Sequence, residues 1–79
     1  MSYYRVVFYA GGLCVGEDAY LCRGMSHALR LAEYVKLAFT RAACVELGLP
    51  FEPSRVAFDV FGVTHAETAN NVNLATIAS

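Results

Sequence analysis

The sequence predicts a small α+β domain in which one long helix lies across one face of an antiparallel sheet, in the order β-β-α-β. Two observations favour this fold. Two stretches rich in β-branched and aromatic residues are joined by Gly11-Gly12, and an uninterrupted stretch rich in Ala and Leu follows them. A third β-rich stretch comes next, and no linker divides the chain. We therefore expect residues 1–79 to form a single compact domain.

The first two strands are predicted to form a hairpin. Tyr3–Ala10 is the first strand, and Gly11-Gly12 can adopt the positive φ angles of a tight turn. Leu13–Cys22 is the returning strand, where Glu17-Asp18 marks either a bulge or a solvent-facing edge. Alternation in the first strand places Tyr4, Val6, Phe8 and Ala10 on one face and Tyr3, Arg5, Val7 and Tyr9 on the other.

A long helix is predicted to follow the hairpin. Ser26 is the expected N-cap, because its hydroxyl can accept a hydrogen bond from a free amide of the first turn. No Gly or Pro interrupts the chain from His27 to Leu47, and Gly48 and Pro50 end the helix. Apolar residues at three- and four-residue steps predict the stripe that packs on the sheet: Ala28, Leu31, Ala32, Val35, Phe39 and Ala42.

The third strand is predicted over Arg55–Val63. Val56, Phe58 and Val60 would face the helix, and Ala57, Asp59, Phe61 and Val63 would face away. Thr64 and Glu67 have capping-box spacing, which favours a brief helical turn. For the end of the chain, a short fourth strand over Val72–Ile77 is slightly favoured over a helix that continues to the terminus.

Composition indicates an interaction protein. The chain is 57% hydrophobic and 16% charged, whereas soluble domains have about 45–50% apolar and about 25% charged residues. So short a chain leaves part of its apolar surface outside, where it favours a protein partner or a second copy. The net charge of −1 and the lack of a basic block disfavour nucleic-acid binding. No apolar stretch is long enough to cross a membrane.

Two surfaces are the candidate binding sites. One is a stripe on the otherwise polar side of the helix, and the other is the sheet face turned away from the helix. Alternatives stay open for both: isolated exposed apolar residues are common, the C-terminal segment can cover the sheet face, and aromatic sheet faces can stack single-stranded nucleic acid. The candidates are Arg30, Tyr34, Leu37, Arg41 and Cys44 on the helix, and Tyr3, Arg5, Tyr9 and Phe61 on the sheet.

Residues suited to catalysis or metal binding form no recognisable motif. The cysteines Cys14, Cys22 and Cys44 are odd in number and have no CxxC spacing, and His27 and His65 are far apart. We therefore expect neither an enzyme nor a metal or cofactor site. Buried thiols, a reducing cytoplasm and no signal peptide are the expected setting. We expect a homodimer, and a disulfide through Cys44 on the polar helix side is one form of it.

The order Tyr3–Ala10, Leu13–Cys22, helix Ser26–Leu47 and Arg55–Val63 resembles the small phage-encoded anti-CRISPR proteins, several of which inhibit multi-subunit type I effector complexes. The resemblance is one of architecture and size, and it assigns a role to no single residue. It implies a non-enzymatic inhibitor in the cytoplasm of a bacterial host. Such an inhibitor would bind a Cas effector subunit and block the recruitment of DNA or of the nuclease.

Overall fold

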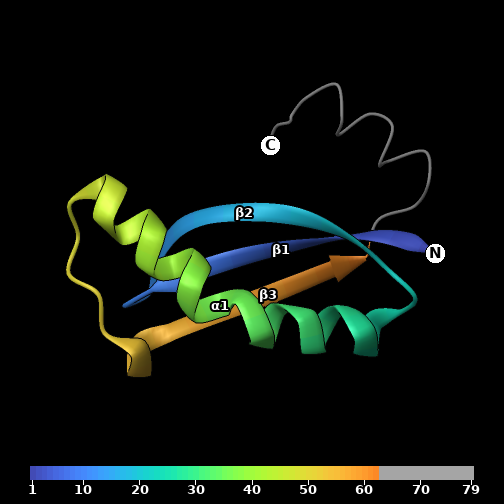
Figure 1. The fold of residues 1–79 in the computed structure, drawn as a ribbon. Helices are drawn as coiled ribbons and strands as arrows, with labels where there is room; N and C mark the ends of the chain where they lie inside the picture. Colours follow the sequence, from blue (N-terminus) through green and yellow to red (C-terminus); the bar gives the residue numbers. More distant parts are fainter. Residues whose placement is uncertain (63–79) are drawn as a thin grey trace.

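The predicted α+β architecture is confirmed by the structure, a computed structural model that describes residues 1–62. Its three strands form one antiparallel sheet in the order β2-β1-β3, and the helix lies across one face of it (Figure 1). No helix within residues 1–62 is long and apolar enough to cross a membrane. The predicted turn at Thr64 and the fourth strand lie outside the described residues. The elements are β1 (Ser2–Ala10), β2 (Leu13–Cys22), α1 (Met25–Leu47), the 3-10 turn η1 (Pro53–Arg55) and β3 (Val56–Gly62).

The predicted hairpin is present, and Gly11 and Gly12 have φ angles of 58° and 85°. Phe8 pairs with Gly16 but Tyr9 pairs with Cys14, so Val15 is the extra residue of a bulge. The bulge therefore precedes Glu17-Asp18. Both acidic residues are exposed on β2, an edge strand, which confirms the solvent-facing alternative for that pair.

The start of α1 differs from the prediction. The helix begins at Met25, and Gly24, in extended conformation, occupies the N-cap position without a side-chain hydrogen bond. Ser26 lies one residue inside the helix and is exposed, so it is not the cap. Instead, the Ala28 amide donates to the Gly24 carbonyl, and the Arg23 amide donates to Nδ1 of His27. These contacts fix the start of the helix without a capping hydroxyl.

The predicted end of α1 is confirmed at Gly48, which has a φ of 71°. The Gly48 amide donates to the Val45 carbonyl, and the Leu49 amide donates to the Cys44 carbonyl at 2.9 Å. This pair of bonds is a Schellman motif, in which a left-handed residue satisfies the last carbonyls of the helix. Leu49 packs against the core beside it.

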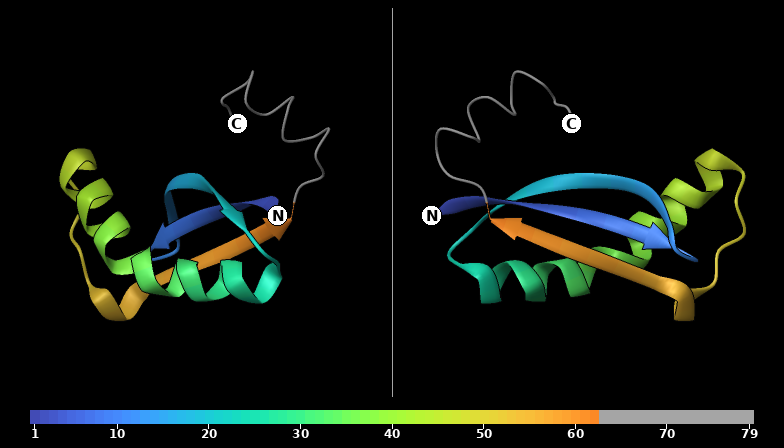
Figure 2. Two further views of the ribbon diagram at one scale, coloured as in Figure 1. Left: turned by 45° about the vertical axis from the view of Figure 1, so that its right-hand side comes forward. Right: turned by 180° about the vertical axis from the view of Figure 1, so that it is seen from behind.

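The apolar face of α1 is not the single straight stripe that we predicted. Ala28 and Ala32 are buried in the first half, whereas Thr40 and Cys44 are buried in the second. Ala42, predicted in the core stripe, is exposed. The helix is bent, so that its two halves run in different directions (Figures 1 and 2). The Thr40 hydroxyl donates to the Lys36 carbonyl, a contact that competes with the helical hydrogen bonds and bends helices.

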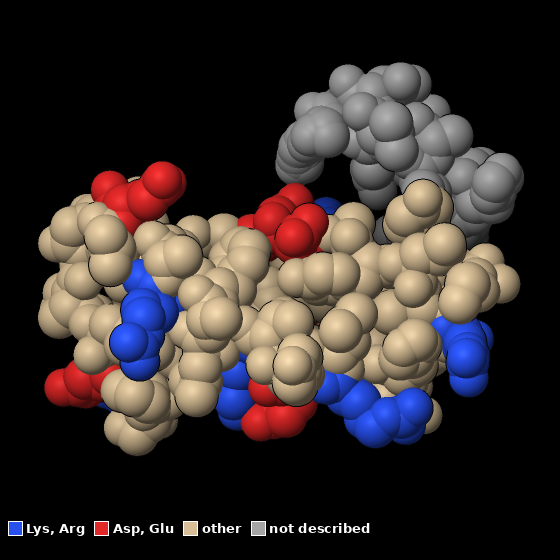
Figure 3. All heavy atoms as spheres, in the orientation of Figure 1, with Lys and Arg blue, Asp and Glu red and all other residues tan. Residues whose placement is uncertain are grey.

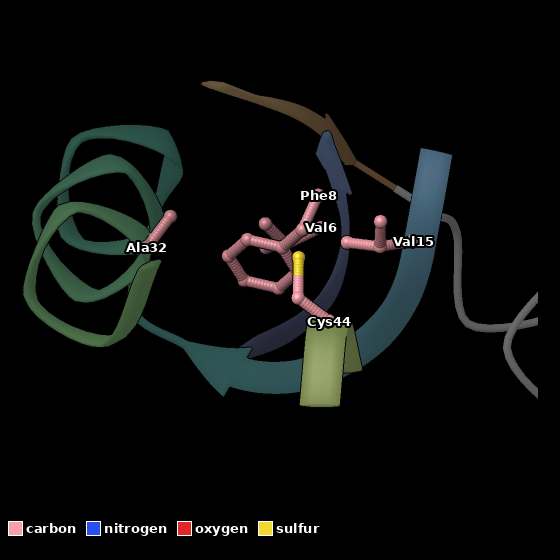
Figure 4. Packing of buried hydrophobic residues seen from close by; sticks show 5 residues of the cluster. All are labelled: Val6, Phe8, Val15, Ala32 and Cys44. Atoms are coloured by element: carbon pink, nitrogen blue, oxygen red, sulfur yellow. The ribbon is translucent and has the colours of Figure 1, made fainter. Parts of the chain in front are cut away.

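The core lies between the bent helix and the sheet. Figure 4 shows residues of β1, β2 and both halves of the helix converging around Phe8. The Phe8 ring stacks on Phe39 with a centroid distance of 4.2 Å, and Phe58 approaches it at 6.5 Å. Tyr20 packs against this cluster, and burial, together with the nearby Asp18, raises the pKa of its phenol to about 12.

Strand β3 has the predicted faces but begins one residue later than predicted. Arg55 ends the turn η1 instead of beginning the strand, and Val63 lies outside the described residues. The residues of the predicted inner face are partly buried, namely Val56, Phe58 and Val60. Those of the predicted outer face are exposed, namely Ala57, Asp59 and Phe61. Among residues 1–62, no helix lies over this side of the sheet.

Candidate functional site

The sheet face that the helix leaves uncovered is one of the two predicted surfaces, and we call it the open sheet face (Figure 2, right). Strand pairing places residues of neighbouring strands side by side in rows across it. Its rows, each read from β2 through β1 to β3, are Ala19–Arg5–Phe61, Glu17–Val7–Asp59 and Cys14–Tyr9–Ala57, with Leu21–Tyr3 at the end.

The first of these rows is built around Arg5. Its Cζ lies 5.0 Å from the centroid of the Phe61 ring, which is the geometry of a cation–π contact. The Nε atom of Arg5 is buried and has no hydrogen-bond partner. Within residues 1–62, Arg5 also forms no ion pair. The row therefore holds a positioned guanidinium whose Nε is not satisfied by the described residues.

The neighbouring row is acidic at both ends and apolar at its centre. Val7 lies between Glu17 and Asp59, and it is only 8% exposed although the helix does not cover it. Val7 is thus not the exposed apolar residue that the sequence predicted. Tyr9 donates a hydrogen bond to the Asp59 carboxylate, and this bond is the main cause that raises the pKa of the Tyr9 phenol.

The second candidate surface lies on the helix side of the molecule. Arg30, Tyr34, Leu37 and Arg41 are exposed as predicted, and Tyr34 is 85% exposed. Prediction missed Val45, which is 74% exposed and follows Tyr34 by three helical turns. Its spacing from Tyr34 is the signal that would have found it. We call this set the outer helix surface, and it comprises Arg30, Tyr34, Leu37, Ala38, Arg41, Ala42 and Val45.

The outer helix surface is apolar along its centre and carries separated charges. The guanidinium of Arg41 lies over the Phe51 ring, with its Cζ 5.2 Å from the ring centroid, so the loop after the helix positions it. On the face shown in Figure 3, Lys and Arg alternate with Asp and Glu around broad uncharged areas, and no large patch of one sign forms. Such a mixture provides no single-sign patch for a polyanion such as nucleic acid.

Cys44 does not belong to the outer helix surface. It is fully buried in the core, because the bend of α1 turns this part of the helix toward the sheet. The exposed location that motivated a Cys44 disulfide is therefore wrong. The other predicted residues form two groups on opposite sides of the molecule, so the structure does not join them into one site.

We predict that Cys14 is the thiol that reacts first in the folded protein. Cys14 is exposed, whereas Cys22 and Cys44 are buried. At a protein concentration low enough for single chains to predominate, a water-soluble thiol reagent should therefore modify one thiol quickly in native buffer and all three in denaturant. Mass spectrometry of the modified protein identifies the residue, and the Cys14→Ser variant is the control. Rapid native labelling of Cys44 would contradict the buried location of this residue.

Groups that bind metals or act in catalysis are dispersed. Within residues 1–62, no three His, Cys, Asp or Glu side chains lie close enough together to hold a metal ion. The imidazole of His27 accepts a hydrogen bond from the Arg23 amide at the start of the helix, which is a structural contact. Comparison with protein-family models, with curated proteins and with solved structures finds no match to this chain.

Proposed function

We propose that this chain is a non-enzymatic inhibitor that binds a partner protein through its outer helix surface. The observation that carries the proposal is Tyr34, an aromatic side chain 85% exposed on the apolar stripe of this surface. Tyr and Arg supply much of the binding energy at protein interfaces, because they bury large surfaces while keeping polar groups for hydrogen bonds. Leu37 and Val45 extend the apolar contact along the helix.

Charge on this surface favours a partner that has acidic groups around an apolar centre. Within residues 1–62, neither Arg30 nor Arg41 forms an ion pair, whereas Glu33 is already paired with Lys36 at 2.5 Å. The two guanidinium groups are thus available to carboxylates of a partner. Exposed interface charges of this kind mainly steer association and fix the orientation of the complex.

We propose a subunit of a type I CRISPR–Cas effector as the partner. The β-β-α-β order and the size of the chain resemble the phage-encoded anti-CRISPR proteins, and this resemblance supports a subunit of a type I CRISPR–Cas effector as the partner. In this form the chain occupies a surface of the effector and blocks the recruitment of DNA or of the nuclease.

The test uses a purified type I effector and measures its DNA binding and nuclease recruitment with increasing amounts of the chain. We expect Tyr34→Ala to weaken inhibition about 30-fold, which corresponds to the ~2 kcal/mol of an interface hot spot. Leu13→Ala is the matched control, since Leu13 is an exposed apolar residue at the hairpin turn, away from the helix. Equal inhibition by both variants would reject the outer helix surface, and no inhibition by the wild type would reject this partner class.

Single-stranded nucleic acid is disfavoured as the ligand. A stacking platform would use Tyr3, Tyr9 and Phe61 on the open sheet face, and it also needs cations that neutralise phosphates. Arg5 is the one basic side chain in the paired rows of that face, and Glu17 and Asp59 lie in the next row. We expect no binding of short oligonucleotides at low salt, where phosphate contacts are strongest.

A further inference from the structure

We propose that the open sheet face is the interface between two copies of this chain, in which Arg5 of each copy lies over the Glu17–Val7–Asp59 row of the other. The observation behind this proposal is the order of charges along the face. The row that contains the cation is directly followed by the row that contains two carboxylates. This proposal is independent of the partner proposed for the outer helix surface, which lies on the other side of the molecule.

Two-fold symmetry makes this charge order self-complementary. A two-fold axis that passes between the Arg5 row and the Val7 row reverses the strand direction, and it brings each row over the other row of the second copy. The contact between Arg5 and the acidic row then occurs twice. The same operation places Tyr3 over Tyr9 of the second copy. An axis through the Val7 row itself would instead bring carboxylates over carboxylates.

The state of Arg5 in the single chain supports an external acceptor. Its guanidinium is held against Phe61, and it forms no ion pair with Glu17 or Asp59 of its own chain. A planar guanidinium matches a carboxylate in a bidentate contact, and this contact strengthens when the surroundings exclude water. The acidic row of a second copy supplies two carboxylates at the place where the symmetry puts Arg5.

Apolar contact accompanies the ion pairs. Tyr3, Leu21 and Phe61 are exposed on the same face, at 40%, 48% and 42%, and none of them lies under the helix. Packing two such faces about 10 Å apart buries these side chains between the sheets, as in a β-sandwich. A nucleic acid on this face would instead have to approach two carboxylates for each cation, which disfavours it.

The experiment tests the charge order by mixing two variants. Arg5→Glu faces the acidic row with a like charge, and the double variant Glu17→Lys with Asp59→Lys faces Arg5 with like charges. We expect the wild type to be dimeric in light scattering and sedimentation, and each variant alone to raise the dimer dissociation constant at least about 100-fold. Mixed in equal amounts, the two variants have opposite charges at both contacts, so a heterodimer should form.

Two control variants show whether the effect is specific to the open sheet face. Arg30→Glu reverses a charge on the outer helix surface and should leave the dimer intact, and so should Tyr34→Ala. Circular dichroism checks that each variant is folded. If Arg5→Glu does not fold, the Glu17 and Asp59 variant, whose residues are exposed, still tests the interface alone. A monomeric wild type, a dimer that survives Arg5→Glu, or a folded pair that stays monomeric on mixing would overturn the proposal.

Discussion

Replacing Phe8 with Ala is expected to remove most of the stability of this domain. Phe8 is fully buried, stacks on Phe39 of the helix and contacts Phe58 of β3. Truncation of a buried Phe to Ala costs about 3–5 kcal/mol, because apolar contact is lost and a cavity remains. A single core in a chain this short supplies only about 3–5 kcal/mol of net stability. We therefore expect Phe8→Ala to be largely unfolded at room temperature.

Denaturant unfolding followed by circular dichroism measures this effect. Tyr34→Ala is the matched control, since it removes an aromatic ring of similar size from an exposed position and should change the free energy of unfolding by less than about 0.5 kcal/mol. A Phe8→Ala protein that unfolds at the same denaturant concentration as the control would show that this ring is not the centre of the core.

The fold was predictable because local signals agree with one another. The β-branched and aromatic residues of Tyr3–Ala10, whose side chains alternate between two faces, the Gly11-Gly12 turn and the helix end at Gly48 each indicate one conformation, and the structure has all three. Packing the helix across the sheet buries the apolar stripe of the helix against one apolar sheet face. The open sheet face follows from the same alternation, so its β1 residues were also predictable.

The bend of the helix was not predictable from a period of 3.6 residues. A straight helix that buries Ala32 and Phe39 turns Cys44 toward solvent, which is why Cys44 was placed on the wrong face. Glu46 is a sequence feature that argues against a straight apolar stripe. It follows Phe39 and Ala42 by seven and four residues, so a straight helix would place it on the same buried face, and yet it is exposed. A charge at that position indicates that the buried face has moved around the helix by its last turns.

The charge rows of the open sheet face depend on the bulge at Val15. Without the bulge, the two-residue turn would pair Val7 with Gly16 and Arg5 with Asp18. The extra residue moves the pairing by one position, so that Glu17 lies beside Val7 and faces away from the helix. The sequence indicated an irregularity near this point but not its position. The acidic row opposite Arg5 therefore became visible only in the structure.

Gly16→Ala, beside the same bulge, should destabilise the protein by overpacking the core. Gly16 pairs with Phe8, and a Cβ at this position would lie 3.1 Å from both Cε1 and Cζ of Phe39. The Phe39 ring has little freedom to move away, since it stacks on Phe8 at 4.2 Å. Overpacking of this kind costs about 1–3 kcal/mol. Chemical denaturation of wild type and variant measures the difference in the free energy of unfolding.

A double-mutant cycle with Phe39→Leu identifies the cause of that loss. Leu lacks the ring atoms that the new methyl group would meet, so Gly16→Ala should cost less in the Phe39→Leu background than in the wild type. Residues in direct contact show coupling energies of about 0.5–3 kcal/mol in such cycles, whereas independent sites add within about 0.5 kcal/mol. If the effects of the two substitutions simply add, contact with the Phe39 ring is not the cause of the loss. The glycine would then be needed for the backbone conformation beside the bulge.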